Sequence, residues 1–598
     1  MAPSYPNPAA SAPEQKPLLS GHRMVPIDDS DERGDSYMDM SLLVPCLLFF
    51  SLLFYGFFAD WDIGQELSKP LPTYNVAIVG MQFLDKILRA FIFPLLDRLS
   101  NILQGAGPAG ISAAQHLRNS RAARTSVHFN ITIYESKPVL GGALALHHAN
   151  GSSVFPKDDP NQSPITAEDI AGTALMWNNA LFTQDSEKAL KDKIKFTELG
   201  PERIGYYQNA LKTASASRPY RKTPTKTWAQ LLWTYGNSVW RGDKLARDGA
   251  LRKAMLRAPL VPDVERIFKS LGVLNPLKQP AKDMLRDRRV SERYAADFLE
   301  PQVQRAYGQG LNEVTGLAAM MAAAQEESAN AYGGGNLLQQ LRRVVHSIGV
   351  DVRTARRVTD IKYVEIGERP RAWLVRHESA DSGGGNSSIE LFDKVIMAAL
   401  DLDIQLQDSE EPPLDLRTYY SVDASAAKAA VREGDPVVPV HITFFTSDAK
   451  LSPWDDEQVL FLEPQELAGM RELTLVREII NSRDSSADVE YLYRVLSQRP
   501  ILDELQSRTN ITWSYQTKIE KAYPILSPLQ HFPSFEIPWA RGFWWTSGIQ
   551  RAGTSVDLNW LAGKVAAEAL ISEVTQNGKT YVPEILCQEI FEGEGCYS

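Results

Sequence analysis

The sequence predicts an α/β protein in which a Rossmann-like domain is interrupted by an inserted, largely helical α+β domain. The first observation is an apolar strand at Asn75–Gly80 and, further on, a glycine-rich turn at Gly105–Gly110. The second is helical spacing of apolar residues after that turn, and then a β-rich run that ends at Glu135. The third is a change of character over residues 149–328, where helical patterns rich in tryptophan and basic residues replace strands.

The glycine turn has the pattern expected of a dinucleotide site. Gly105 allows a tight turn, Gly107 lets the backbone approach a pyrophosphate, and Gly110 lets the helix pack close to the strand. The phosphates would lie on free N–H groups at the positive end of the helix dipole. Glu135 is placed to bind the ribose hydroxyls; the alternative is a solvated charge at a strand end.

A second glycine pair indicates which dinucleotide binds. Gly141 and Gly142 follow Glu135 closely, an arrangement more typical of FAD than of NAD, because this loop passes near the flavin phosphates and ribityl chain. Many such flavoproteins continue with an arginine that pairs with the pyrophosphate, whereas this chain has Ala143. An ordinary turn is the alternative. The sequence therefore predicts an FAD-binding domain of the amine-oxidase and glutathione-reductase type.

The strand and the glycine turn are separated by Met81–Gln104. There is normally no spare residue at this place, because the strand must deliver the chain directly onto the phosphates. One explanation is an intron translated by mistake, and we favour it. The alternative is a genuine amphipathic insertion, because the segment has a helical apolar stripe. Either way, we expect the insertion to misplace the N–H groups of the turn and to weaken FAD binding.

Composition and patterning divide the chain into successive segments. We expect a disordered tail at 1–37 and a signal peptide or signal anchor at 38–60. The remaining predicted segments are the FAD-binding domain at 72–148, 329–405 and 531–575, the substrate domain at 149–328 and 406–530, and a C-terminal tail at 576–598.

The amino-terminal part predicts entry into the secretory pathway. Residues 41–59 are 19 uncharged, mostly apolar residues, on the border between a membrane-spanning helix and a signal-peptide core. Four glycosylation sequons are compatible with this location: Asn130, Asn150, Asn386 and Asn510. A fifth, at Asn161, is weakened by Pro164.

Charge and cysteine content limit the possible partners. The net charge of −10 argues against a nucleic acid or an anionic membrane held by surface electrostatics. Only three cysteines occur, and Cys46 lies in the apolar run, so Cys587 and Cys596 are the plausible disulfide pair. A CxxC motif or Cys/His metal site is absent from the sequence.

Several motifs together resemble one family. "FLEPQVQRAYGQ" at Phe298–Gln309 and "YGGGN" at Tyr332–Asn336 are followed in order by "FDKVIMAAL" and "WWTSGIQRAGTSVDLNWLAGKVAAEAL". In this the chain resembles the prenylcysteine oxidase (prenylcysteine lyase) family, unevenly from about Tyr74 to Ile571. The resemblance implies an FAD-dependent thioether oxidase of the lysosome or vacuole, which cleaves farnesyl- or geranylgeranyl-cysteine to cysteine, a prenyl aldehyde and hydrogen peroxide.

The resemblance also implies site residues. It implies that FAD is held by Gly105, Gly107, Gly110, Glu135, Gly141, Gly142, Gly334, Gly335, Asn336, Val358, Gly548 and Gln550. Val358 would hold the adenine through its backbone. Gln550 stands where the family usually has a glutamate, so this contact brings no charge. His147 and Tyr307 are candidate acids or bases, but hydride abstraction needs none that is strong, and no catalytic side chain is assigned.

Two other functions stay open from the sequence. The chain would otherwise be another amine-oxidase-like flavoprotein oxidase, or a membrane-anchored relative without catalysis. Ala143, Gln550 and the interrupted turn favour the non-catalytic relative. The prenylcysteine reading predicts a small apolar substrate and oxygen as the partners, with possible membrane anchoring through residues 41–59.

Overall fold

The fold is known from a computed structural model, in which all described residues belong to one unit of the chain, residues 71–598. The described residues are 73–79, 102–120, 128–146, 164–166, 169, 171, 180–192, 204–208, 211–214, 225–246, 251, 255–323, 337–366, 369–379, 387–399, 405–407, 414–415, 437–451, 459–462, 469–481, 488–507, 509–530, 532, 534–536 and 542–575.

Several predictions fall outside these residues. They include the tail at 1–37, the segment at 38–60, most of the insertion, the carboxyl-terminal segment, Asn150, Asn161, Asn386, and the pair Cys587 and Cys596. Within the described part, no helix combines the length and apolar character needed to cross a membrane. The apolar run at 41–59 lies outside that part.

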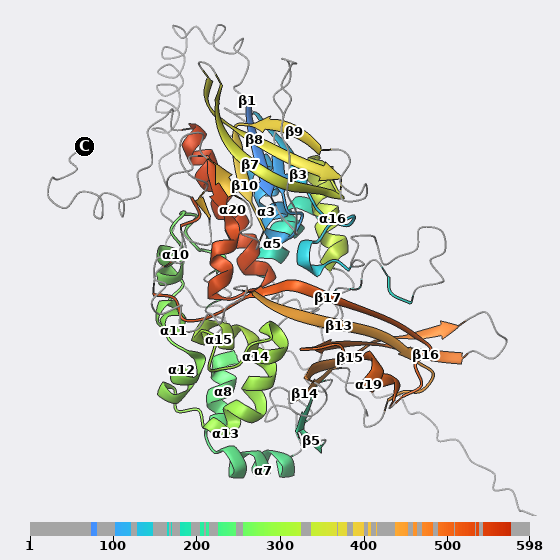
Figure 1. The fold of residues 1–598 in the computed structure, drawn as a ribbon. Coiled ribbons are helices and arrows are strands. Elements are labelled where there is room, and N and C mark those ends of the chain that lie inside the picture. The colour runs from blue at the N-terminus through green and yellow to red at the C-terminus, as the bar shows by residue number, and fades with distance from the viewer. Residues whose placement is uncertain are drawn as a thin grey trace, which may run out of the picture. The chain divides into compact units, whose positions relative to one another are not determined.

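A six-stranded parallel sheet forms the first domain, in the order β18-β10-β1-β3-β2, with β6 also pairing with β3. Its strands are β1 (Thr73–Val79), β2 (Ile102–Gln104), β3 (His128–Tyr134), β6 (Asp351–Arg353), β10 (Lys394–Met397) and β18 (Phe543–Trp545). The helices beside it are α3 (Pro108–Asn119), α16 (Leu337–Ile348) and α20 (Val556–Thr575). This β-α-β arrangement confirms the predicted α/β class (Figure 1).

Successive side chains of each strand point to opposite faces of this sheet, and the two faces pack on different elements. Ile396 and Trp544 pack with apolar residues of α3 and α20, whereas Met397 and Trp545 pack against a second, five-stranded sheet. That sheet has the order β12-β11-β7-β8-β9. Its strands are β7 (Arg356–Ile366), β8 (Arg369–Ser379), β9 (Ser387–Phe392), β11 (Gln405–Gln407) and β12 (Leu414–Asp415).

The second domain combines a seven-stranded sheet with a group of helices (Figure 1). The strand order is β17-β13-β16-β15-β14-β4-β5, all neighbours antiparallel except β14 and β4. The strands are β4 (Ile204–Gln208), β5 (Leu211–Ala214), β13 (Val437–Ser447), β14 (Val459–Leu462), β15 (Met470–Asn481), β16 (Asp488–Ser497) and β17 (Trp513–Pro524), with α19 (Leu502–Gln506). The helices are α7 (Thr225–Tyr235), α8 (Ser238–Ala246), α10 (Val264–Ser270), α11 (Leu274–Lys278), α12 (Ala281–Asp287), α13 (Glu292–Tyr294), the π-helix η3 (Ala295–Leu299), α14 (Glu300–Tyr307) and α15 (Gly316–Ala323).

The segment at 149–328 is less uniform than the sequence suggests. Its strand β4 lies parallel to β14, so the two predicted substrate segments share one sheet. Helix α5 (Leu181–Leu190) instead packs on α16 and α20 of the first domain, and the Gln115 amide of α3 donates to the Asp185 carbonyl at 3.0 Å. There Asp557 accepts a hydrogen bond from the Phe182 N–H at 2.9 Å, and Lys564 pairs with Asp185 at 2.9 Å. Helix α5 therefore belongs to the first domain, although it lies within the segment predicted as the insert.

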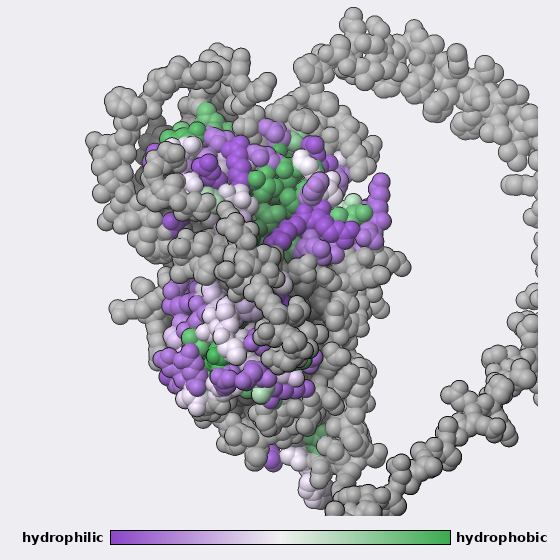
Figure 2. Space-filling view, turned by 90° about the vertical axis from the view of Figure 1, so that its right-hand side faces the viewer, coloured by the Kyte–Doolittle hydropathy of each residue, from purple (hydrophilic) through white to green (hydrophobic). Residues whose placement is uncertain are grey.

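Most large apolar side chains in the described residues are buried. Three are exposed, namely Trp233, Trp240 and Ile389. On the face shown in Figure 2, hydrophilic described residues predominate, with several smaller hydrophobic areas among them. The described apolar residues thus lie mainly in the cores between the layers.

Candidate functional site

The glycine turn follows β2 directly. The Gly105 N–H donates to the Tyr134 carbonyl at 2.6 Å, at the end of the neighbouring strand β3. Gly105 has a φ of 111°, and a Cβ there would lie 3.1 Å from the Ala398 carbonyl oxygen. Helix α3 then begins at Pro108. Only glycine fits this first position, because both its backbone angle and the available space exclude a side chain.

Strand β2 resolves the question raised by the interrupted motif. Strand β1 pairs with β3, and the last pair is Ile78 with Ile133. Strand β2 pairs with the end of β3: Leu103 lies opposite the same Ile133, and Gln104 lies opposite Tyr134. Strand β2 also lies against β1 and β10. A second short strand therefore delivers the chain onto the turn. The expectation that the insertion misplaces the turn is wrong, because the turn takes its position from β2 and β3.

This geometry changes the expected effect of removing the insertion. A version lacking residues 80–104 loses β2, but β1 can take its place, because Ile78 and Leu103 pair with the same Ile133. This version, in which Val79 is followed by Gly105, should therefore hold the same amount of flavin per protein as the full chain. The absorbance ratio of flavin to protein after purification measures this. Severalfold more flavin in the shortened protein would show that the intervening residues obstruct the site after all.

The loop at Gly141 and Gly142 lies close to the glycine turn at Gly105–Gly107. A Cβ on Gly142, whose φ is 58°, would lie 3.1 Å from the Gly107 Cα. The Gly141 N–H donates to the Ala106 carbonyl at 2.9 Å, which ties the second loop to the first. Gly141 has a φ of 128°, and a side chain there would meet Leu338 of α16. The bare backbones thus form a narrow cradle beside the start of α3.

Helix α3 is held by α20 on its other side. Gly110 is buried in α3, and a side chain at Gly563 of α20 would meet the Ala109 carbonyl. The Ser112 hydroxyl donates to the Trp560 carbonyl at 2.6 Å. Sequence analysis missed Gly563. Its only local signal is a glycine within a long apolar helix, where glycine costs about 1 kcal/mol relative to alanine and therefore needs a packing reason.

Glu135 is buried rather than solvated, with 4% of its surface exposed. One carboxylate oxygen accepts from the Ala106 N–H at 2.9 Å and the other from the Lys137 N–H at 3.1 Å. Burial raises the pKa of this carboxyl and lowers the pKa of Lys137 to about 8. The Lys137 ammonium donates to the Gly142 carbonyl at 2.7 Å. Glu135 and Lys137 therefore join the two glycine loops.

Strand β7 of the five-stranded sheet begins beside Glu135 and Lys137. The Arg356 N–H donates to the Glu135 carbonyl at 2.9 Å, and the Ala355 N–H donates to the Lys137 carbonyl at 2.9 Å. Val358 follows in β7, and its side chain is fully buried between the two sheets. Any contact with an adenine would therefore use the Val358 backbone, as the sequence predicts.

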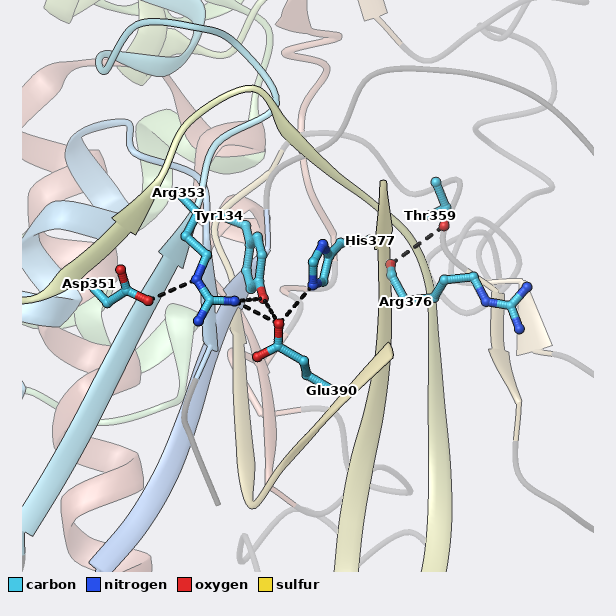
Figure 3. Close-up of polar contacts among 7 residues, drawn as sticks. All are labelled: Tyr134, Asp351, Arg353, Thr359, Arg376, His377 and Glu390. Atoms are coloured by element: carbon cyan, nitrogen blue, oxygen red, sulfur yellow. Dashed lines mark hydrogen bonds and ion pairs between the residues drawn. The ribbon is translucent and has the colours of Figure 1, made fainter. Parts of the chain in front are cut away.

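A polar cluster fixes the five-stranded sheet against β3 (Figure 3). One Glu390 oxygen, on β9, accepts from the Tyr134 hydroxyl at 3.0 Å and from Arg353 at 2.6 Å, and lies 2.9 Å from Nε2 of His377. Arg353 also pairs with Asp351 at 2.8 Å. Burial would raise the pKa of Glu390, but the His377 hydrogen bond and the Arg353 charge hold it at about 2. Because Tyr134 immediately precedes Glu135, this cluster also holds Glu135 in place.

The last predicted contacts follow β18. Gly548 and Gln550 lie in the 3₁₀-helix η5 (Thr546–Ala552), where the Gln550 amide donates to the Ser547 hydroxyl at 3.3 Å. The Thr546 hydroxyl donates to the Met397 carbonyl at 3.3 Å, at the end of β10. The carboxyl ends of β2, β10 and β18 therefore meet at one edge, where open α/β sheets bind ligands.

Some sequence-predicted residues are not brought to this edge. Gly334, Gly335, Asn336 and the candidate His147 lie outside the described residues. Tyr307 lies in the second domain, at the end of α14. Asn130 is half-buried within β3, which is unsuited to a glycan, whereas Asn510 is exposed.

Comparison with protein families identifies the group to which this fold belongs. The profile described as prenylcysteine lyase matches residues 223–581, more than half of the 598 residues. The chain belongs to the prenylcysteine lyase family. As a member of that family, the protein is a flavin-dependent oxidoreductase. The matched region begins after the glycine turn, so the assignment of Gly105–Glu135 depends on geometry.

The solved structures to which this prenylcysteine lyase family member is similar are distant from it in sequence. A redesigned putrescine oxidase is 14% identical, with a TM-score of 0.47, covering 84% of this chain and 100% of its own. A fatty acid isomerase from P. acnes that produces CLA is 14% identical, with a TM-score of 0.44, covering 80% and 98%. An oxidoreductase from Methanosarcina mazei is 12% identical, with a TM-score of 0.43, covering 79% and 99%. A search of curated proteins finds no significant match.

The residues at the sheet edge fit the flavin that the prenylcysteine lyase family implies. The approach of Gly107 and Gly142 leaves backbone without side chains where α3 begins. A pyrophosphate needs such bare backbone and the N–H groups of the helix end. Glu135 would face the ribose, and η5 would face the flavin end.

Proposed function

We propose that the protein is an FAD-dependent thioether oxidase that cleaves farnesyl- or geranylgeranyl-cysteine during turnover of prenylated proteins. The observation that carries the proposal is the family match over 223–581. That region includes α14, most of the seven-stranded sheet and the segment around η5. The glycine cradle supports FAD as the cofactor.

The reaction balances with water and oxygen as the co-reactants. The bound flavin would accept a hydride from the prenyl carbon next to sulfur and later return two electrons to oxygen. Water supplies the oxygen atom of the aldehyde, and the carbon–sulfur bond breaks to release cysteine. One prenylcysteine, one water and one oxygen thus give one cysteine, one prenyl aldehyde and one hydrogen peroxide.

The protein's own contribution would be a dry, apolar surface next to the cofactor. One face of the seven-stranded sheet carries mainly apolar side chains, and Leu146, which follows the second glycine loop, packs on it. The other apolar members of this face include Val440, Ile442, Phe444, Leu492, Leu496 and Ile519. These side chains are buried together with Leu146, so an isoprenoid chain held beside them would be shielded from water.

Oxidase assays with two substrate classes test the proposal. We expect the purified protein to show a flavin absorbance spectrum and to release peroxide with S-farnesylcysteine but not with putrescine. Peroxide release with putrescine alone would indicate an amine oxidase instead. A colourless protein that releases no nucleotide on heating would indicate a non-catalytic relative.

We also propose that the protein acts in the lumen of the lysosome or vacuole, either released there or anchored through residues 41–59. The apolar run and the exposed sequon at Asn510 support this location. An endoglycosidase-sensitive mass shift that disappears in Asn510→Gln would support lumenal exposure. Its absence in the expressed protein would count against use of this sequon.

A further inference from the structure

A buried polar cluster lies where α14 packs on the seven-stranded sheet. Glu472 of β15 accepts from Arg494 at 2.8 Å and from the Thr474 hydroxyl at 2.5 Å, and it also forms an ion pair with Arg305 of α14. These side chains point to the apolar face of the sheet, because Leu473 and Leu475 pack on the opposite face. The cluster therefore brings charge to an otherwise apolar surface.

Arg471 is a further buried cation beside this cluster. It is 5% exposed, and one of its terminal nitrogens donates to the Gly308 carbonyl at 3.0 Å. No carboxylate in the described residues lies within ion-pair distance of Arg471, and its Nε–H has no acceptor. Burial lowers the pKa of Arg471 to about 10. The charge of Glu313 acts on Arg471 in the opposite direction, but Glu313 forms no ion pair with it. A buried guanidinium that no carboxylate contacts directly is costly unless an anion completes the site.

The absence of a side chain at Gly308 leaves room for the Arg471 guanidinium. Gly308 ends α14 with a φ of 69°, and a side chain there would meet the Arg471 guanidinium and lie 3.1 Å from Val438. Tyr307, the preceding residue, is fully buried, and its hydroxyl has no hydrogen-bond partner among the residues that the structure describes. Its ring lies perpendicular to that of Tyr523, with 6.1 Å between the ring centroids. Two buried donors without acceptors thus flank one tight turn.

Hydrogen bonds connect this turn to the flavin side of the first domain. The Gln309 amide donates to the Pro524 carbonyl at 2.9 Å and accepts from the Leu526 N–H at 2.8 Å. The Leu526 carbonyl accepts from the Thr315 N–H at 2.7 Å, and the Thr315 hydroxyl donates to the Ala552 carbonyl at 3.1 Å. Ala552 ends η5, the helix that carries Gly548.

We propose that Arg471 and Tyr307 bind the carboxylate of the amino-acid part of the substrate. A guanidinium N–H and a phenol O–H are the donors that a carboxylate accepts, and charge-assisted bonds of this kind are strong. The cysteine end of the thioether would then be held at the polar cluster, while its prenyl chain lies along the apolar face. This inference rests on the proposed function.

The alternative is that Arg471 only caps the carbonyl end of α14, where a cation is favourable. Substrates with and without a carboxylate distinguish the two. We expect kcat/KM for S-farnesylcysteine to exceed that for S-farnesylcysteamine, which lacks the carboxylate, by roughly 10- to 100-fold. Arg471→Gln should remove most of this preference, because it should lower kcat/KM for S-farnesylcysteine and leave kcat/KM for S-farnesylcysteamine unchanged. Tyr307→Phe should reduce the preference by roughly 5- to 10-fold.

The controls separate binding from folding and from the proposed function. Arg499→Gln alters an exposed arginine and should leave the preference unchanged. Arg471→Lys keeps a cation at the helix end but loses the planar fork, so it should also lose preference. Binding of both compounds, followed through the flavin spectrum, should show the same discrimination without turnover.

Three results would count against these ideas in different ways. If Arg471→Gln slows both substrates equally and keeps the preference, Arg471 is only a cap, and the inference is overturned. If the unchanged protein binds the acid no more tightly than the amine, the inference also fails. If it binds the acid selectively but oxidises neither thioether, the proposed oxidase function fails while the carboxylate site stands.

Discussion

A Gly107→Ala variant should fold normally and yet lose its flavin. The Gly107 φ is −82°, which alanine adopts without strain, and a Cβ there would have the Gly142 Cα at 3.8 Å as its nearest neighbour. The protein itself therefore accepts this methyl group. A pyrophosphate lying on the start of α3 would not, because the added Cβ occupies the space that its close approach requires.

The expected size of the effect follows from this difference. We expect flavin per protein to fall below about a tenth, which requires a loss of well over about 1.4 kcal/mol of binding free energy, since that energy changes the dissociation constant tenfold. The unfolding free energy of the flavin-free protein should change by less than about 0.5 kcal/mol. Flavin absorbance and chemical denaturation of the same preparations measure the two quantities.

Two other glycines serve as controls. Gly142→Ala should lose both flavin and stability, because its φ is 58° and its Cβ would lie 3.1 Å from Gly107. Gly272→Ala carries a comparable backbone strain, with a φ of 72°, but has open space around it. It should lose some stability and keep its flavin. Full flavin in Gly107→Ala would place the pyrophosphate away from this turn.

Local patterns predicted the β-α-β unit that carries the glycine turn. Gly105, Gly107 and Glu135 belong to one β-α-β unit, in which short-range turn chemistry determines the geometry. The same patterns suggested that the insertion misplaces the turn. That was wrong, because Ile102–Gln104 forms a second strand on β3, a tertiary pairing that overrides the interruption.

Contacts between distant segments were beyond sequence reasoning. Strand β4 pairs with β14, which lies more than 200 residues later in the chain. The local sequence of a strand does not indicate which distant strand it pairs with. Helix α5 has an ordinary amphipathic pattern, which does not reveal that it packs on α20. Tyr307 was a candidate from its motif, but Arg471, which contacts the next residue Gly308, follows a strand pattern with no chemical signature.

A Glu472→Gln variant should lose about 3–5 kcal/mol of unfolding free energy, the usual cost of leaving a buried charge without its partner. The Glu472 and Arg305 side chains are completely buried, and Arg494 is 2% exposed. Glutamine keeps the shape and some hydrogen bonds, so the loss reports the missing charge. Denaturation by urea, with flavin content measured in parallel, gives the value.

An exposed pair provides the matched control. Arg499 and Glu504 are 3.0 Å apart with side chains 62% and 42% exposed, so Glu504→Gln should cost at most about 1 kcal/mol. Equal losses in the two variants would show that the buried cluster contributes no more than a surface ion pair.

The pH dependence gives an independent check on the same carboxylate. Burial would raise the pKa of Glu472, but Arg305 and Arg494 hold it at about 2, below the ordinary value of 4.5. Because the folded state has the lower pKa, the contribution of Glu472 is complete above pH 4.5 and is lost as the pH falls toward 2. The stability difference between the unchanged protein and Glu472→Gln should therefore shrink over that interval. A difference that stays constant through it would mean that Glu472 is already protonated in the folded protein at neutral pH, and Arg305 and Arg494 would then be two cations without a counter-charge from this carboxyl.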